Sequence, residues 1–174
     1  LNPLTRNVTN SPTLSEGNLR SVTGQGGSLG TMSMSTGKWY WEVLNHTVTT
    51  WHYIGIIDDV EANTGSVGAT LNPTNGISYQ QQGKIYKNGS YDGNVVATYT
   101  SNGEVLGFAY DADANTIKFY NNNVLVAQSS DSAHRTPSTP VGDYAPFVLS
   151  SGSTAVANFG QDSSFAGNKT AQGN

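Results

Sequence analysis

Short apolar segments separated by turn-forming residues constrain this chain more than any other feature of its sequence. The clearest segment, residues 37–44, places Trp39, Trp41 and Val43 on one side of an extended strand. Turn signals recur about every 8–12 residues, and no segment has the period of an amphipathic helix. The sequence therefore predicts an all-β fold, a two-sheet antiparallel β-sandwich whose core takes one face of this strand.

Further strands are predicted between the turn signals. They cover residues 51–57, 77–79, 84–87, 104–110, 116–120, 124–127, 145–149 and 155–159. Gly55 interrupts an aromatic and β-branched segment, which indicates a bulge or the close approach of another backbone. Residues 104–110 and 116–120 are expected to form an antiparallel hairpin. The glycine-rich segment 24–30 lacks the spacing and the strand-to-helix context of a phosphate-binding loop, so we expect a flexible loop there.

The composition agrees with strands and tight turns. Only 11% of the 174 residues are charged, and Gly, Ser, Thr and Asn are abundant instead. The net charge of −4, with eight scattered Lys and Arg residues, argues against nucleic acid or an anionic membrane as a partner. No apolar run is long enough to predict membrane insertion. The chain contains no cysteine, which excludes disulfides, thiolate metal sites and a cysteine nucleophile.

The length fits a single β-sandwich domain, residues 1–174, with three regions. N-terminal edge strands and loops are expected in residues 1–36, the core of the sandwich in residues 37–160, and a C-terminal tail in residues 161–174. The chain begins at Leu1 rather than at a methionine. We therefore expect a processed product or an excised domain.

Four segments occur in an order that resembles the SPRY domain. They are GKWYWEV at 37–43, YIGI at 53–56, LGFAYD at 106–111 followed by IKFYN at 117–121, and PFV at 146–148 with NFG at 158–160. In that family a G-K-x-Y-W-E-V strand, a V-G-V strand, a hairpin leading to an F-Y-N strand and a P-F…N-F-G ending recur in this order. Trp51 departs from the pattern by lying one residue further from Gly55, and residues 1–36 match only loosely.

The resemblance implies two packed antiparallel sheets of the concanavalin A-like jelly-roll type, no cofactor, and binding through surface loops. Eukaryotic SPRY domains usually bind peptides or proteins. The low charge and the abundance of Asn, Thr and Gly make this chain more similar to the SPRY-like modules of bacteriophage tails, fibres and capsids. We therefore expect a non-catalytic module of a virus particle that recognises a protein or a glycan and belongs to a larger homo-oligomeric assembly.

Four loops are predicted to carry the binding surface. They are residues 45–52, 58–75, 88–94 and 129–144. Aromatic side chains are the best contacts there, because planar rings offer a large area at a low entropic cost. The candidate contact residues in these loops are Trp51, His52, Asp58, Asp59, Tyr91, Asp92 and Tyr144.

A calcium loop is incomplete in this sequence. Asp111, Asp113 and Asn115 copy the first three ligand positions, but Thr116 stands where the loop needs glycine and Asn122 where it needs glutamate. A turn between two strands is therefore favoured, and no metal site is predicted.

Catalytic constellations are also missing from the sequence. No E-x-D-x-x-E string offers the paired carboxylates of a glycosidase, and no G-x-S-x-G elbow offers a nucleophile. Asp58, Asp59 and Glu61 form an acidic cluster typical of an exposed loop. By the resemblance, Glu42 is a structural residue, hydrogen-bonded at a sheet edge. The alternatives to a binding module are a purely structural oligomerisation unit and a lectin-like carbohydrate-active enzyme.

Overall fold

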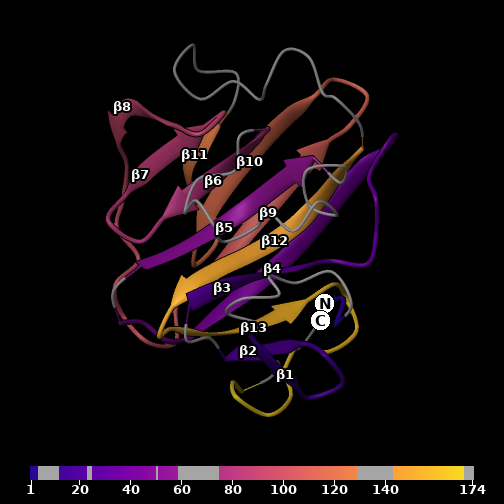
Figure 1. Cartoon of the computed structure of the whole chain (residues 1–174), viewed down its shortest axis with the longest axis vertical. Coiled ribbons are helices and arrows are strands. Elements are labelled where there is room, and N and C mark those ends of the chain that lie inside the picture. Colours follow the sequence, from indigo (N-terminus) through magenta and orange to yellow (C-terminus); the bar gives the residue numbers. More distant parts are fainter. Residues whose placement is uncertain (4–11, 23–24, 50, 59–74, 129–142, 171–174) are drawn as a thin grey trace.

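The chain forms two antiparallel β-sheets that lie face to face (Figure 1). The computed structural model describes residues 1–3, 12–22, 25–49, 51–58, 75–128 and 143–170. None of these residues lies in a helix, and so none of them forms a helix that could cross a membrane. The predicted all-β sandwich is confirmed.

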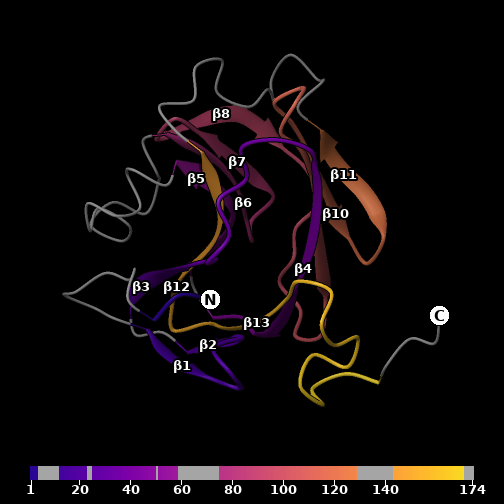
Figure 2. The same cartoon turned by 90° about the vertical axis from the view of Figure 1, so that its right-hand side faces the viewer.

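One sheet has seven strands and the other has six. The seven-stranded sheet has the order β1 (Thr13–Ser15), β2 (Arg20–Val22), β13 (Thr154–Asn158), β4 (Lys38–Thr47), β9 (Val105–Asp111), β10 (Thr116–Asn121), β11 (Val124–Gln128). The six-stranded sheet has the order β3 (Gln25–Leu29), β12 (Tyr144–Ser151), β5 (Trp51–Asp58), β6 (Gly76–Gln80), β7 (Lys84–Lys87), β8 (Ser90–Val95). Figure 2 shows the two layers from the side, with β5 and β12 in one and β4 and β10 in the other.

The strands predicted from the sequence coincide with observed strands to within a few residues at each end. The hairpin predicted from residues 104–110 and 116–120 is the pair β9 and β10, in which Phe119 lies opposite Phe108. In β4 the alternation also holds, because Trp41 and Val43 are buried between the sheets. On the opposite face of the same strand, Leu44 packs against a smaller apolar cluster.

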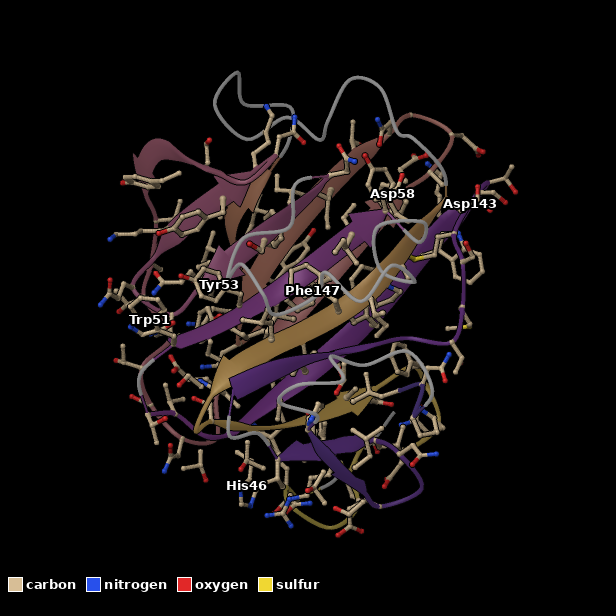
Figure 3. All side chains as sticks on the ribbon, in the orientation of Figure 1. His46, Trp51, Tyr53, Asp58, Asp143 and Phe147 are labelled. Atoms are coloured by element: carbon tan, nitrogen blue, oxygen red, sulfur yellow. The ribbon has the colours of Figure 1, made fainter. Side chains whose placement is uncertain are left out.

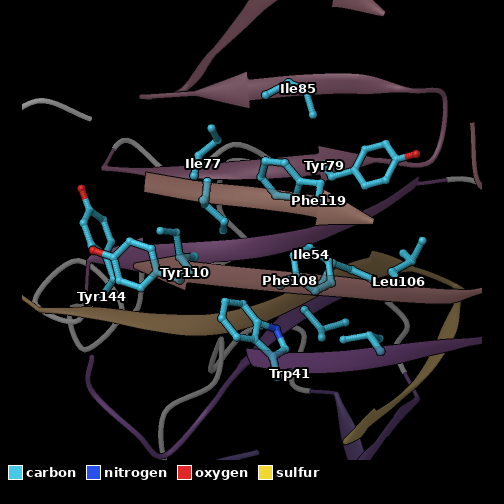
Figure 4. Close-up of a cluster of buried hydrophobic side chains, with 14 of the residues drawn as sticks. Trp41, Ile54, Ile77, Tyr79, Ile85, Leu106, Phe108, Tyr110, Phe119 and Tyr144 are labelled. Carbon is cyan, nitrogen blue, oxygen red and sulfur yellow. The ribbon is translucent and has the colours of Figure 1, made fainter. Parts of the chain in front are cut away.

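The core between the sheets is built around a chain of aromatic rings, which Figure 4 shows in close-up. Trp41 stacks on Phe108, with ring centroids 5.3 Å apart. Phe119 meets Phe108 edge-on at 5.7 Å and Tyr79, from the opposite sheet, at 5.9 Å. Tyr79 in turn meets Tyr99 edge-on at 4.7 Å. These offset and edge-on arrangements are the ones that aromatic pairs prefer, so the rings fix how the two sheets face each other.

The glycine-rich segment is a strand, and the expected flexible loop over residues 24–30 is wrong for the part that the structure describes. Residues 25–29 form β3, which pairs with β12 so that Leu29 lies opposite Phe147. The backbone of residues 26–30 is buried. A ladder partner from a distant part of the chain, which local sequence does not reveal, holds these glycines extended.

Two further expectations are corrected by the sheet order. Most of the expected loop 88–94 belongs to β8, which covers residues 90–95 and pairs with β7. Glu42 does not lie at a sheet edge, because its strand β4 is flanked by β13 and β9. Its carboxylate accepts hydrogen bonds from the Tyr40 hydroxyl at 3.0 Å and from the Asn158 amide at 3.4 Å, on the outer face of the sheet.

The segment that copies part of a calcium loop is a turn, as predicted. Asp111 accepts a hydrogen bond from the Ala114 amide at 3.0 Å, and Asp113 accepts one from the Gly37 amide at 2.9 Å. Asp111 also forms an ion pair with Lys38, and this contact lowers the pKa of the Asp111 carboxyl. The carboxylates therefore close the hairpin and tie it to the start of β4.

Gly55 permits the close approach of β6, one of the two explanations that its position suggested. A Cβ atom at this position would lie 2.1 Å from the Ile77 carbonyl oxygen and 2.8 Å from the Ser78 Cα. Both atoms belong to a backbone that is paired on its other side with β7, so it cannot move away. The ladder runs through Gly55 without a shift of register, which excludes a bulge.

We expect Gly55→Ala to destabilise the domain by about 3 kcal/mol or more, because the added methyl overlaps buried backbone. The matched control is Gly107→Ala in β9. There the added Cβ meets the hydroxyl of Tyr40 at 2.7 Å, and this half-exposed side chain can swing away. The control should stay within about 1 kcal/mol of wild type in urea unfolding. Equal losses in the two variants would contradict this explanation of Gly55.

Candidate functional site

An aromatic strip crosses one end of the outer face of the six-stranded sheet. It consists of Trp51, Tyr53, Tyr86 and Tyr91, from β5, β7 and β8. Tyr53 meets Tyr86 edge-on at 5.3 Å, and Tyr86 meets Tyr91 at 5.8 Å. Trp51 precedes Tyr53 by two residues and so lies on the same face of β5, at the end of the strand (Figure 3).

Exposure increases toward the two ends of the strip. Tyr53 is buried and joins an apolar layer on this face that also contains Phe147 and Leu149. Trp51 keeps 48% of its surface exposed and Tyr91 keeps 39%. Large exposed rings backed by buried ones are the composition of a binding surface rather than of an ordinary solvated sheet.

Lys84 gives the strip a positive charge. Its ammonium lies 5.5 Å from the centre of the Tyr91 ring, a cation–π contact. Within the described residues it forms no ion pair. In the buried part of the strip, desolvation and the neighbouring Tyr86 hydroxyl raise the pKa of Tyr53, which keeps its hydroxyl protonated as a hydrogen-bond donor.

A buried cluster beneath the strip holds β5 and β6 in place. We call it the plug; it consists of Asn45, His52, Gln81 and Tyr99. Tyr99, from the connection between β8 and β9, has its hydroxyl 2.7 Å from the His52 carbonyl and 2.8 Å from the Tyr79 carbonyl. The side-chain oxygen of Gln81 accepts a hydrogen bond from the backbone amide of His52 at 2.8 Å. The backbone amide of Gln81 donates to the His52 carbonyl in return. The backbone that carries Trp51 and Tyr53 is therefore fixed on the inner side by this plug.

His52 belongs to the plug and not to the surface. Its Nδ1 lies 3.0 Å from the Asn45 side-chain oxygen. Because that oxygen only accepts, Nδ1 carries a proton. Within the described residues Nε2 is buried without a hydrogen-bond partner. Desolvation lowers the pKa of His52 to about 3.

The structure divides the predicted contact residues into an exposed pair and a buried set. Trp51 and Tyr91 are exposed and lie at the two ends of the aromatic strip. The expectation that His52 would lie on the surface is wrong, since its side chain faces Tyr99 between the sheets. In a strand, consecutive side chains point to opposite faces, so Trp51 and His52 could not both face solvent.

Asp58 and Tyr144 are also buried, so the expectation that they are exposed loop residues is wrong. They lie opposite each other at the end of β5 and the start of β12. Tyr144 packs edge-on against Tyr110 at 5.8 Å. Asp58 ends a strand of eight residues that begins at Trp51, about 23 Å away. Figure 3 shows Trp51 and Asp58 at opposite ends of β5, and so the predicted residues do not form one surface.

Two of the predicted contact residues remain, Asp59 and Asp92. Asp59 lies outside the described residues, as do most of the predicted loops 58–75 and 129–144. Asp92 lies in β8, a strand rather than a loop.

Sequence reasoning missed three residues of this region: Tyr53, Tyr86 and Lys84. The alternation within residues 51–57 does place Trp51 and Tyr53 on one face, and that within residues 84–87 does the same for Lys84 and Tyr86. The pattern does not show which face of β5 is the outer one, because both faces carry large apolar side chains.

The strip can offer apolar contact, hydrogen bonds and one cation. Within the described part of the chain, no group of three or more His, Cys, Asp or Glu side chains is arranged to hold a metal ion. The surface is suited to holding a ligand, and the nearest histidine, His52, is sealed behind it.

A second candidate surface lies on the outer face of the seven-stranded sheet. It is a hollow of about 320 Å³ over β9, whose lining includes Lys38, Ala109, Asp111, Lys118 and Tyr120. The ion pair of Lys38 and Asp111 occupies one end. Because this pair neutralises its own charges, the hollow is a weaker candidate than the strip.

The sequence matches the SPRY domain family over residues 38–162. A comparison with curated proteins finds no match. Among solved structures, the SPRY domain of human HERC1 superposes with a TM-score of 0.72 at 14% identity, over 92% of this chain and 98% of that one. A human SPRY domain has a TM-score of 0.61 at 17% identity, over 87% and 96% of the two chains. Stonustoxin has a TM-score of 0.61 at 16% identity, covering 84% of this chain and 24% of that one.

We expect the plug to make stability fall in acid. The unfolded chain binds a proton at His52 below its usual pKa of about 6.5, whereas the folded chain resists protonation down to about 3. The free energy of unfolding should therefore drop as pH falls through this window, with His52 contributing a slope of up to about 1.4 kcal/mol per pH unit.

His52→Asn tests this contribution, because its amide can donate to Asn45 in place of Nδ1 but does not titrate. The variant should be less stable at neutral pH and show a flatter pH profile in urea unfolding. His46→Asn is the control, since His46 lies outside the plug, in contact with Thr47. An identical pH profile for His52→Asn and wild type would contradict the role of His52.

Proposed function

We propose that this chain, which belongs to the SPRY domain family, binds a protein partner through the aromatic strip and catalyses no reaction. SPRY domains are generally non-catalytic modules of protein–protein interaction. The observation that carries the proposal is the run of touching rings from buried Tyr53 to exposed Tyr91. A ring that packs on other rings is already ordered before binding, so its side chain loses little conformational entropy when a partner contacts it.

The chemistry of the strip favours a peptide with an apolar or aromatic anchor followed by an acidic residue. Trp51 and Tyr91 offer the exposed apolar area, and Lys84 offers the cation beside Tyr91. A carboxylate on the partner would form an ion pair with the Lys84 ammonium at the rim of the contact.

A place on a virus particle is part of the same proposal. It is supported by the composition, which has 11% charged residues and many Asn, Thr and Gly. Immunogold labelling of intact particles with an antibody to this chain is the test. Labelling of the particle surface would support the virion location. Purified particles without label would contradict that location.

We expect Trp51→Ala and Tyr91→Ala each to weaken binding about 30-fold, as the loss of a large aromatic contact residue does. The probe is a peptide selected from a random library on the wild-type domain, with affinities measured by calorimetry. Tyr40→Ala is the matched control, because Tyr40 is 53% exposed on the other sheet and lies outside the strip. A loss shared equally by Tyr40→Ala, or a library that yields no binder, would refute the strip as the binding surface. Selection of glycans instead of peptides on an array would point to the other ligand class.

The charge of Lys84 generates a separate expectation. Lys84→Gln should weaken the selected peptide by about 3-fold to 5-fold and reduce the salt dependence of binding. Lys118→Gln, at an exposed lysine on the seven-stranded sheet, should change neither quantity. A salt dependence that persists unchanged in Lys84→Gln would contradict the pairing of Lys84 with an acidic residue of the peptide.

A further inference from the structure

The strand β11 is an apolar, uncharged edge of the seven-stranded sheet. Among the described strands it pairs only with β10. Its sequence, VLVAQ, contains neither a charge nor a proline. Val124 is 65% exposed and Leu125 is 45% exposed. Because these two residues are consecutive in a strand, they project to opposite faces of the sheet and leave apolar surface open on both sides.

The other three sheet edges carry the features by which proteins prevent strand pairing. At one edge, β1 has only three residues. At another, the edge of β3 is met by the N-terminal chain, where the Asn2 amide donates to the Leu29 carbonyl at 2.6 Å. The third, β8, contains an aspartate in its sequence. A register shift occurs both at β8, against β7, and at β11, against β10, so it does not distinguish these two edges. The strand β11 has no charge and no proline, and it is longer than β1 at five residues.

We propose that β11 is a self-association surface, at which two copies of this chain pair their β11 strands antiparallel about a two-fold axis. The pairing would join two seven-stranded sheets into one continuous sheet. It would supply hydrogen-bond partners to the open side of β11 and cover Val124 and Leu125. This inference goes beyond the binding of a partner at the aromatic strip, which lies on the other sheet and stays open.

A second copy fits this edge for two reasons. Two antiparallel β11 strands have the same length, and every register between them places uncharged side chains opposite each other, so like charges never meet. Leu125 also continues an existing row, since it lies directly opposite Tyr120 of β10. In the paired sheets this row would extend across the two-fold axis as one apolar band.

Sedimentation velocity over a range of concentrations tests the proposal directly. Wild type should show a dimer whose fraction rises with concentration. Leu125→Lys should move the midpoint of dimerisation at least tenfold higher, because it brings two ammonium groups to the joined edges. Val22→Lys is the matched control, since Val22 is 40% exposed in β2, which is paired on both sides. A wild type that stays monomeric, or a dimer that survives Leu125→Lys unchanged, would overturn the proposal.

Spin labels identify the edge that pairs, because the chain contains no cysteine and accepts a single engineered one. A label at Lys118→Cys in β10 would lie three strand spacings from its copy, about 14 Å between backbones, apart from any shift along the strands. A label at Val22→Cys would lie eleven spacings away, about 50 Å before twist is included. A short distance for Lys118→Cys with a long one for Val22→Cys supports β11 pairing. The reverse order would exclude it, whatever the outcome for the aromatic strip.

Discussion

The fold depends on the ring contacts that tie the two sheets together. Phe108 and Phe119 of the seven-stranded sheet and Tyr79 of the six-stranded sheet meet in the middle of the sandwich. Each ring reaches its neighbour only if its strand keeps its register, because a slip of one residue would turn the ring to the outer face. The aromatic chain thus sets the register of several strands at once, and the short hairpins follow from it.

The aromatic strip depends on the same core through its backbone. Tyr99 ends the chain of core rings, and its hydroxyl lies between the carbonyls of His52 and Tyr79. Those carbonyls belong to the strand that carries Trp51 and to its neighbour. A side chain that would contact a ligand is therefore placed by polar groups buried one residue away, on the opposite face of the strand.

Local sequence was sufficient for the strands and for one face of β4, where Trp41 and Val43 alternate with more polar neighbours. It was insufficient where a distant partner decides burial. Residues 25–29 look like a loop until β12 pairs with them, and Tyr144 looks exposed until Tyr110 packs against it. The strip was half predicted for the same reason: Trp51 and Tyr91 were predicted, but a strand with large apolar side chains on both faces does not show locally which face is the outer one.

The contrast between Trp41 and Trp51 equips the domain with an optical reporter. Trp41 is buried and stacked on Phe108, whereas nearly half of Trp51 faces water at the proposed contact surface. A soluble quencher such as iodide reaches the second indole and not the first. Once the partly buried Trp39 is replaced by phenylalanine, fluorescence emission from Trp51 can therefore follow occupancy of the strip while Trp41 monitors the integrity of the core, without any added label.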